Sequence, residues 1–236
     1  MEKKFTLKLA QRDHSSAFST SQFEPESSVQ SPSPLLEVCF DLQEKKGRTV
    51  SLHPLPPELE SHYQAARKDL SSIIFMTIPC PSVRNVTYGP IREQGRYYHS
   101  KSQIVVGDNI IYNAQRGDLA LFRIVIFHEY GHAFYAVQYK VGIETIISNT
   151  RTPKLEVFSL AVNEAFALWI EHGIDPTNNL KEEDTEGLEG FADVELLKAM
   201  YASLKSTGKE KGILYVLDHF HQIAGEELTL RTGVSG

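Results

Sequence analysis

A long apolar segment, residues 119–139, constrains the fold of this chain more than any other feature. Gly117 interrupts the preceding segment, and Asp118 is a favoured helix N-cap because its carboxylate can accept a hydrogen bond from the first turn. Apolar residues then fall on most sides of the expected helix, as in a helix at the centre of a domain. The other segments must therefore form layers that cover this helix.

Three polar residues stand in the middle of this apolar helix: His128, Glu129 and His132. The two histidines are four residues apart, so they project from one face, one turn apart. Imidazoles placed in this way can bind one zinc ion, while the glutamate beside the first histidine acts on the water at the metal. Burying these residues without a shared purpose would be costly. The pattern predicts a Zn²⁺ site with Glu129 as general base.

A second helix is expected from Pro153 to Gly173, because proline is favoured at the first helical position and glycine just past the last. Glu164 falls inside its apolar face, and a buried carboxylate needs a cation or a metal ion beside it. Glu164 is therefore the predicted third zinc ligand, with Glu156 and Glu171 as fallback candidates. The apolar face consists of Val157, Leu160, Ala161 and Leu168.

An explanation of Glu164 without a metal is also open. At the edge of the apolar face its side chain can reach water, or it can pair with Arg151 or Lys154.

The expected strands come before the expected helices, which favours an α+β fold over alternating βαβ units. Residues 1–34 include a Ser- and Pro-rich stretch that cannot offset its ordering entropy by burial, so we expect a disordered tail before a single domain, 35–236. The expected elements are a strand Leu36–Leu42, a turn at Lys46-Gly47, a helix Pro57–Leu70, a strand Ser72–Ile78, strands within Tyr97–Tyr112 with a hairpin turn at Gly107-Asp108-Asn109, and helices 119–139, 153–173, 191–204 and 212–224.

Taken together, His128-Glu129-x-x-His132 and the downstream Asn163-Glu164 resemble the gluzincin group of zinc metallopeptidases, with the thermolysin-type architecture. The resemblance covers roughly residues 70–225, and only the two short motifs are specific. Compact minigluzincins fit it, and so do ImmA/IrrE-type intracellular metallopeptidases. The latter place a strand and an Asn-containing turn before the motif, here Ile110-Ile111-Tyr112-Asn113.

The resemblance implies a zincin-like fold, in which a small twisted mixed sheet packs over the active-site helix, a second helix lies below, and the C-terminal half is helical. The edge strand of such a sheet binds the substrate in extended form, and Gln103–Tyr112 would be that strand. Many members carry an aspartate four residues after the glutamate ligand, which orients a zinc histidine. This chain has Leu168 there, so that partner is not identified.

The resemblance also implies a Tyr or His that steadies the oxyanion of the tetrahedral intermediate. The candidate donors in this chain are His221, His219, Tyr215 and Tyr201. His219 and His221 are two residues apart and cannot share one helix face.

The function expected from these residues is that of a zinc-dependent peptidase acting on a peptide or protein substrate. One alternative is a zinc-binding regulatory protein with a structural or latent site, although Glu129 argues against it. Another is a different zinc hydrolase or an effector delivered into another cell. The tail or the segment after Gly212 could act as a self-inhibitory segment over the cleft, and Cys80 could silence the zinc as a fourth ligand.

Composition narrows the partners and the compartment. The net charge of −6 gives no basic surface for nucleic acid, and no apolar run is long enough to span a membrane. Two cysteines, Cys39 and Cys80, do not make a disulfide framework. We therefore expect a cytoplasmic protein, or alternatively one translocated by a non-classical secretion route.

Overall fold

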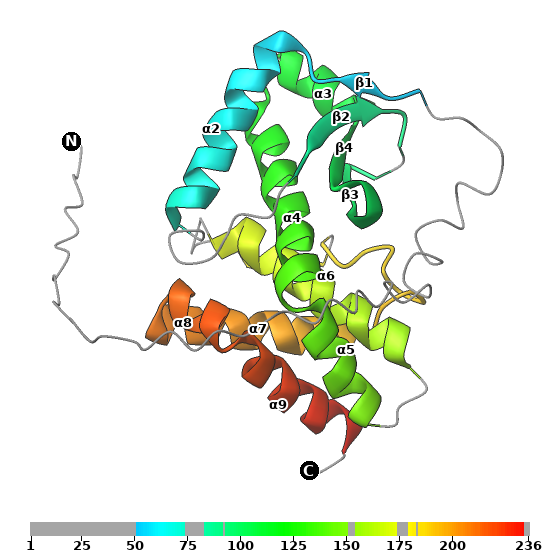
Figure 1. Ribbon diagram of the computed structural model, residues 1–236, viewed down its shortest axis with the longest axis vertical. Coiled ribbons are helices and arrows are strands. Elements are labelled where there is room, and N and C mark those ends of the chain that lie inside the picture. Colours follow the sequence, from blue (N-terminus) through cyan, green and yellow to red (C-terminus); the bar gives the residue numbers. More distant parts are fainter. Residues whose placement is uncertain are drawn as a thin grey trace, which may run out of the picture. The chain divides into compact units, whose positions relative to one another are not determined.

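A computed structural model describes residues 51–73, 83–91, 93–150, 154–173, 179–182 and 184–233, all within the unit Gln43–Gly236 (Figure 1). Several sequence predictions lie outside these residues and are not tested by it. They are the tail 1–34, the strand Leu36–Leu42, the turn at Lys46-Gly47, and the roles considered for Cys39, Cys80 and Arg151.

The apolar segment forms helix α4, Leu119–Gln138, as predicted. Asp118 caps it, since its carboxylate accepts a hydrogen bond from the backbone N–H of Leu121 at 3.3 Å. Side chains on most of its sides are buried, because α2 (Pro57–Ile73), α3 (Asp108–Gln115), α6 (Leu155–Gly173) and strand β3 (Gly95–Tyr98) all pack against it. Figure 1 shows α4 running from the sheet to the C-terminal helices.

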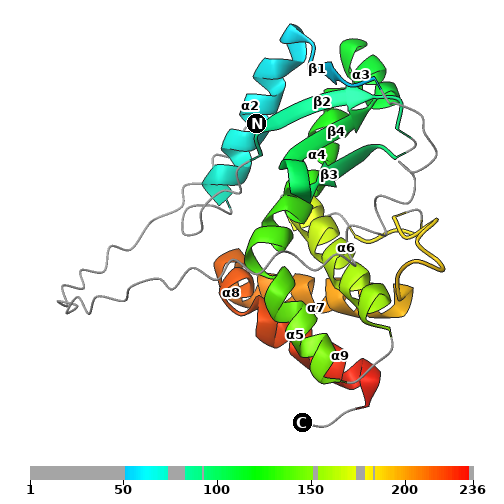
Figure 2. The same ribbon diagram turned by 45° about the vertical axis from the view of Figure 1, so that its right-hand side comes forward.

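The sheet is small and mixed, with four strands among the described residues (Figure 2). These are β1 (His53–Pro54), β2 (Asn85–Gly89), β3 (Gly95–Tyr98) and β4 (Gln103–Gly107), in the order β1-β2-β4-β3. β2 and β4 are parallel, and the outer pairs are antiparallel. With its many helices the chain is therefore an α+β protein, as the order of the predicted elements indicated.

The prediction of an edge strand at Gln103–Tyr112 was right for a strand at Gln103–Gly107, but wrong for its place at the edge and for the residues after Gly107. β4 ends at Gly107 and is paired on both sides, so that β3 forms the edge next to α4. The chain reverses earlier than expected, through a short 3₁₀ helix, His99–Lys101, and Ser102 in the left-handed conformation.

The residues after Gly107 form helix α3, where a hairpin turn and an Asn-containing turn were expected. Asp108 lies in the first turn, where its negative charge interacts favourably with the positive end of the helix dipole. Ile110, Ile111 and Ala114 are buried at helical spacing. Their burial outweighs the strand preference of the Ile-Ile-Tyr run.

Helix α2 confirms the prediction for Pro57–Leu70 and is three residues longer. Its last residues, Ser72 and Ile73, are helical, so the strand predicted to begin at Ser72 was wrong at its start; residues 74–78 lie outside the described part. The predicted face of α2 is buried, and it consists of Leu59, Tyr63, Ala66 and Leu70.

The C-terminal half is helical, as expected. It includes one helix that was not predicted, α5 (Lys140–Asn149), which buries Ile143 and Ile147 one turn apart. The predicted helix 191–204 is α7 (Val194–Lys211), and the predicted helix 212–224 is two helices, α8 (Ile213–Asp218) and α9 (Phe220–Thr232), separated at His219. Among the helices described, none combines the length and apolarity needed to cross a membrane.

Candidate metal centre

The crossing of α4 and α6 brings the two short motifs together. At the crossing Gly131 faces Ala167, and a Cβ added to this glycine would lie 2.7 Å from the Cα of Ala167. The absence of a side chain at Gly131 therefore lets the two helix backbones approach closely. One turn from this contact, the side chains of His128, His132 and Glu164 lie between the helices.

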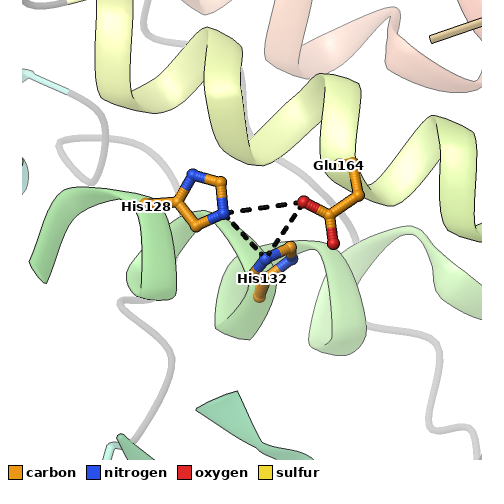
Figure 3. Close-up of side chains that lie close together, drawn as sticks. All are labelled: His128, His132 and Glu164. Atoms are coloured by element: carbon orange, nitrogen blue, oxygen red, sulfur yellow. Dashed lines mark hydrogen bonds and ion pairs between the residues drawn. The ribbon is translucent and has the colours of Figure 1, made fainter. Parts of the chain in front are cut away.

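These three side chains form a group that could hold a metal ion (Figure 3). The Nε2 atoms of His128 and His132 are 3.1 Å apart, and each lies 3.6 Å from Oε2 of Glu164. Ligand atoms about 2.1 Å from a tetrahedral ion are about 3.4 Å from one another. The observed separations therefore match the spacing that one ion would impose.

The outer ring nitrogens each face an acceptor on α6. His128 Nδ1 lies 2.9 Å from Oε2 of Glu171, and His132 Nδ1 lies 3.1 Å from Oδ1 of Asn163. Each Nδ1 therefore carries a proton and donates it, which leaves the Nε2 lone pair of a neutral ring free. Two such lone pairs and one carboxylate oxygen converge, an arrangement that favours a cation between them.

Sequence reasoning did not find these two hydrogen-bond partners. Leu168, which stands where the gluzincin resemblance would place an orienting aspartate, is buried in the apolar core. Glu171, considered only as a fallback ligand, instead holds His128 from behind. It follows Glu164 by seven residues, which is two helical turns on one face, so its spacing was a usable signal. The sequence pattern gives Asn163 only as part of the motif.

Glu129 lies on the side of α4 that faces the sheet. Its side chain is 3 % exposed, and it accepts a hydrogen bond from the backbone N–H of Tyr97 in β3. Its Oε2 has no hydrogen-bond partner among the described residues. Gly95 of β3 lies directly against it, since a Cβ there would be 2.7 Å from Oε1 of Glu129. A buried and unpaired carboxylate oxygen is costly, so its presence beside the group is a sign of function.

The charged groups of the site shift one another's pKa values. Burial lowers the pKa of His128, but hydrogen bonds with Glu164 and Glu171 outweigh it and raise this pKa well above 6.5. Burial raises the pKa of Glu171, yet His128 and His172 bring it down to about 2. Burial also opposes ionisation of Glu164, but the histidines hold its pKa below the usual value. The carboxylates of the site thus favour positive charge beside them.

The pKa of Glu129 moves the other way. Burial raises it above its usual value, and the nearby histidines only partly oppose this. A carboxylate with a raised pKa is a stronger base near neutral pH.

The candidate oxyanion donors do not gather at the group. The ring of His221 packs on Tyr139, seven residues past His132 and thus about 10 Å further along the helix. His219 stacks on Tyr215 within the α8–α9 segment. Tyr201 is buried and bonded to His172, and is the one candidate that is connected to the site.

The three glutamates of α6 differ in how they lie relative to the histidines. Glu156 is exposed in the first turn of α6, two turns before Glu164. Glu164 is paired with the two histidines rather than lying at the edge of its helix face, and Glu171 lies behind His128. Of the three, Glu164 is therefore the one placed to bind an ion between the histidines.

No protein-family model matches the chain, and no curated protein or solved structure matches it significantly.

Proposed function

We propose that this protein is a zinc-dependent peptidase with a zincin-like catalytic core, in which His128, His132 and Glu164 hold the metal and Glu129 is the general base. The observation that carries the proposal is the convergence of the two Nε2 atoms and the Glu164 oxygen at 3.1–3.6 Å, beside a buried carboxylate that does not join them. A structural zinc site needs four protein ligands and no base. The described cluster offers three candidate ligand atoms, and the proposed base, Glu129, is a fourth buried side chain beside them.

The donor set favours zinc. Two imidazoles and one carboxylate are a known combination for catalytic zinc, and three protein ligands leave one coordination position open. The side chains of the cluster are 14–22 % exposed, so a small reactant can reach them. Zinc bound there would lower the pKa of water and polarise a peptide carbonyl.

The residues of the chain supply the proton transfers and the positioning. Oε2 of Glu129 accepts a proton from the attacking water and passes it to the leaving amine. The hydrogen bond from Tyr97 holds the other oxygen, so the free oxygen keeps a fixed direction. β3 lies at the sheet edge next to Glu129, where an extended peptide can add as a further strand.

The test uses the full chain, stripped of metal and reloaded with zinc, on a peptide library read by mass spectrometry. Glu129→Gln should bind zinc as the wild type does and lose hydrolysis by about 10³-fold. Glu164→Gln should lose both, with zinc affinity lower by about 10³-fold, or about 4 kcal/mol. The matched control is Glu156→Gln on the same helix, which should change neither.

Two outcomes would contradict the proposal. One is a zinc-loaded wild type that cleaves no member of the library. The other is Glu129→Gln retaining hydrolysis at the wild-type rate while it binds zinc.

A further inference from the structure

A column of polar side chains leads from the metal cluster into α7. Glu171 contacts His128 through one carboxylate oxygen at 2.9 Å, and its other oxygen lies 3.4 Å from Nε2 of His172. Nδ1 of His172 lies 2.8 Å from the hydroxyl of Tyr201, a residue of α7. His172 and Tyr201 are 8 % and 4 % exposed, so the column runs through the interior.

The donors and acceptors of this column fit together in one direction. Glu171 can only accept, so His172 presents an N–H at Nε2, and its Nδ1 accepts from the Tyr201 hydroxyl. The Nε2 N–H of His172 then donates to Glu171, which accepts from His128 with its other oxygen. Both oxygens of Glu171 are thereby held, and its orientation is fixed from two sides.

Packing alone does not account for the column. Apart from Tyr201 the buried residues of α7 are apolar, and a buried carboxylate, imidazole and phenol are costlier in such surroundings than apolar side chains of similar volume. The column ends on a predicted metal ligand. The buried apolar residues of α7 are Leu196, Leu197, Met200 and Leu204.

We propose that His172 and Tyr201 are positioning residues that hold Glu171, and through it His128, in the orientation that binds metal. The docking of α7 on α6 then sets the metal affinity of a site to which α7 contributes no ligand. Glu171 is then the acceptor that orients a histidine, a role that Leu168 cannot fill. The proposal rests on the metal binding in the proposed function and does not depend on hydrolysis.

Two buried tyrosines provide a matched test. Tyr201→Phe and Tyr139→Phe each remove one hydroxyl with one hydrogen bond of 2.8 Å; Tyr139 donates to the carbonyl of Leu217, outside the column. The full chain is titrated with Zn²⁺ against a chromophoric chelator and with Co²⁺ for its absorption spectrum. The thermal midpoint of the metal-free protein is measured alongside.

Both variants should lower the thermal midpoint of the metal-free protein by about 2–4 °C. Only Tyr201→Phe should also weaken zinc binding, by about fivefold, and change the Co²⁺ spectrum. Glu171→Gln, one step nearer the ligand, should weaken zinc binding by about 10- to 100-fold. His172→Gln should fall between the two.

Equal zinc affinity in Tyr201→Phe and the wild type would overturn the proposal. So would an equal loss of affinity in both tyrosine variants, because this would show general loosening. Either result leaves the proposed function standing if hydrolysis still depends on Glu129. A wild type that binds no zinc overturns both proposals together.

Discussion

The two sides of the metal group differ in how completely their polar atoms are paired. The α6 wall consists of Asn163, Glu164 and Glu171, and each of these side chains contacts a histidine of α4. The sheet wall consists of Gly95 and Tyr97 of β3, which lie against Glu129. There one carboxylate oxygen is buried without a partner in the described part of the chain.

In the proposed function, this difference separates metal binding from proton transfer. Side chains that hold an ion must be oriented before it binds, and the hydrogen bonds of the α6 wall do this. A base must keep an unoccupied lone pair for the reactant, and the sheet wall leaves one at a cost in stability. Variants on the α6 wall should therefore alter metal affinity and stability, whereas variants on the sheet wall should alter hydrolysis.

Among the changes that leave every polar side chain of the site in place, the largest effect is expected from the glycines that bring each wall close. In Gly131→Ala the new methyl group meets the backbone of Ala167, which cannot move without shifting α6. We expect a loss of about 2 kcal/mol in the free energy of unfolding and at least about tenfold weaker zinc binding, because Glu164 moves with α6. In Gly95→Ala the new methyl group meets the side chains of Val125 and Glu129. Because it displaces the base and none of the three ligands, hydrolysis should fall while zinc affinity is kept.

Gly225→Ala in α9 is the matched control. Its new methyl group would lie 3.9 Å from Ile146, and the change should be neutral or stabilise by up to about 1 kcal/mol. Denaturant unfolding and zinc titration measure these quantities. Zinc affinity lost in Gly95→Ala but kept in Gly131→Ala would reverse the assignment of the two walls.

The sequence predicted the α6 wall less completely than the helix it faces. The polar motif within an apolar helix located α4 and its histidines, because burial of unpaired polar groups is too costly to be accidental. Glu164 was predicted from its place in an apolar face. The role of Glu171 was missed because a family pattern directed attention to Leu168, although a spacing of seven residues places Glu171 on the same face.

The sheet wall could not be predicted from local pattern. The Ile-Ile-Tyr run of α3 has strand preference, and only its packing against the rest of the domain makes it helical. Which strand forms the edge depends on the crossover from β2 to β4, a long-range pairing. The contact of Gly95 with Glu129 joins residues far apart in the chain, and no periodicity in the sequence reports it.

The stability of the metal-free chain should change in opposite directions in Glu129→Gln and Glu171→Gln. At neutral pH the first should be more stable than wild type by about 1 kcal/mol, because it removes an unfavourable buried charge. The second should be less stable by about 2 kcal/mol, because it removes a charge that His128 and His172 favour. Urea unfolding in the presence of a chelator measures both.

The difference in stability between each variant and the wild type should change with pH, and the pH range should differ between the two variants. The pKa of Glu171 is about 2 when folded and near 4.5 when unfolded, so its stabilising effect is present above pH 4.5 and is lost as the pH falls towards 2. The pKa of Glu129 is raised on folding, so its cost appears as the pH rises from 4.5 through the raised value. Parallel pH profiles for the two variants would contradict the comparison.

The smallest effect should come from giving the two histidines the same kind of hydrogen-bond acceptor. His128 donates to a carboxylate and His132 to an amide. Asn163→Asp places a carboxylate behind both rings, which raises the basicity of His132 as a ligand. We expect zinc binding to tighten by about threefold, or about 0.6 kcal/mol, because desolvation of the new charge offsets part of the gain.

Asn163→Ala provides the opposite change, since it removes the acceptor and should weaken zinc binding by about tenfold. The comparison of the two variants separates charge from orientation. If Asn163→Asp and Asn163→Ala weaken binding equally, the amide at Asn163 does not orient His132 through the Oδ1 contact. If Asn163→Asp alone tightens binding, the difference between the two histidines is one of ligand basicity, and the carboxylate behind His128 makes it the stronger of the two ligands.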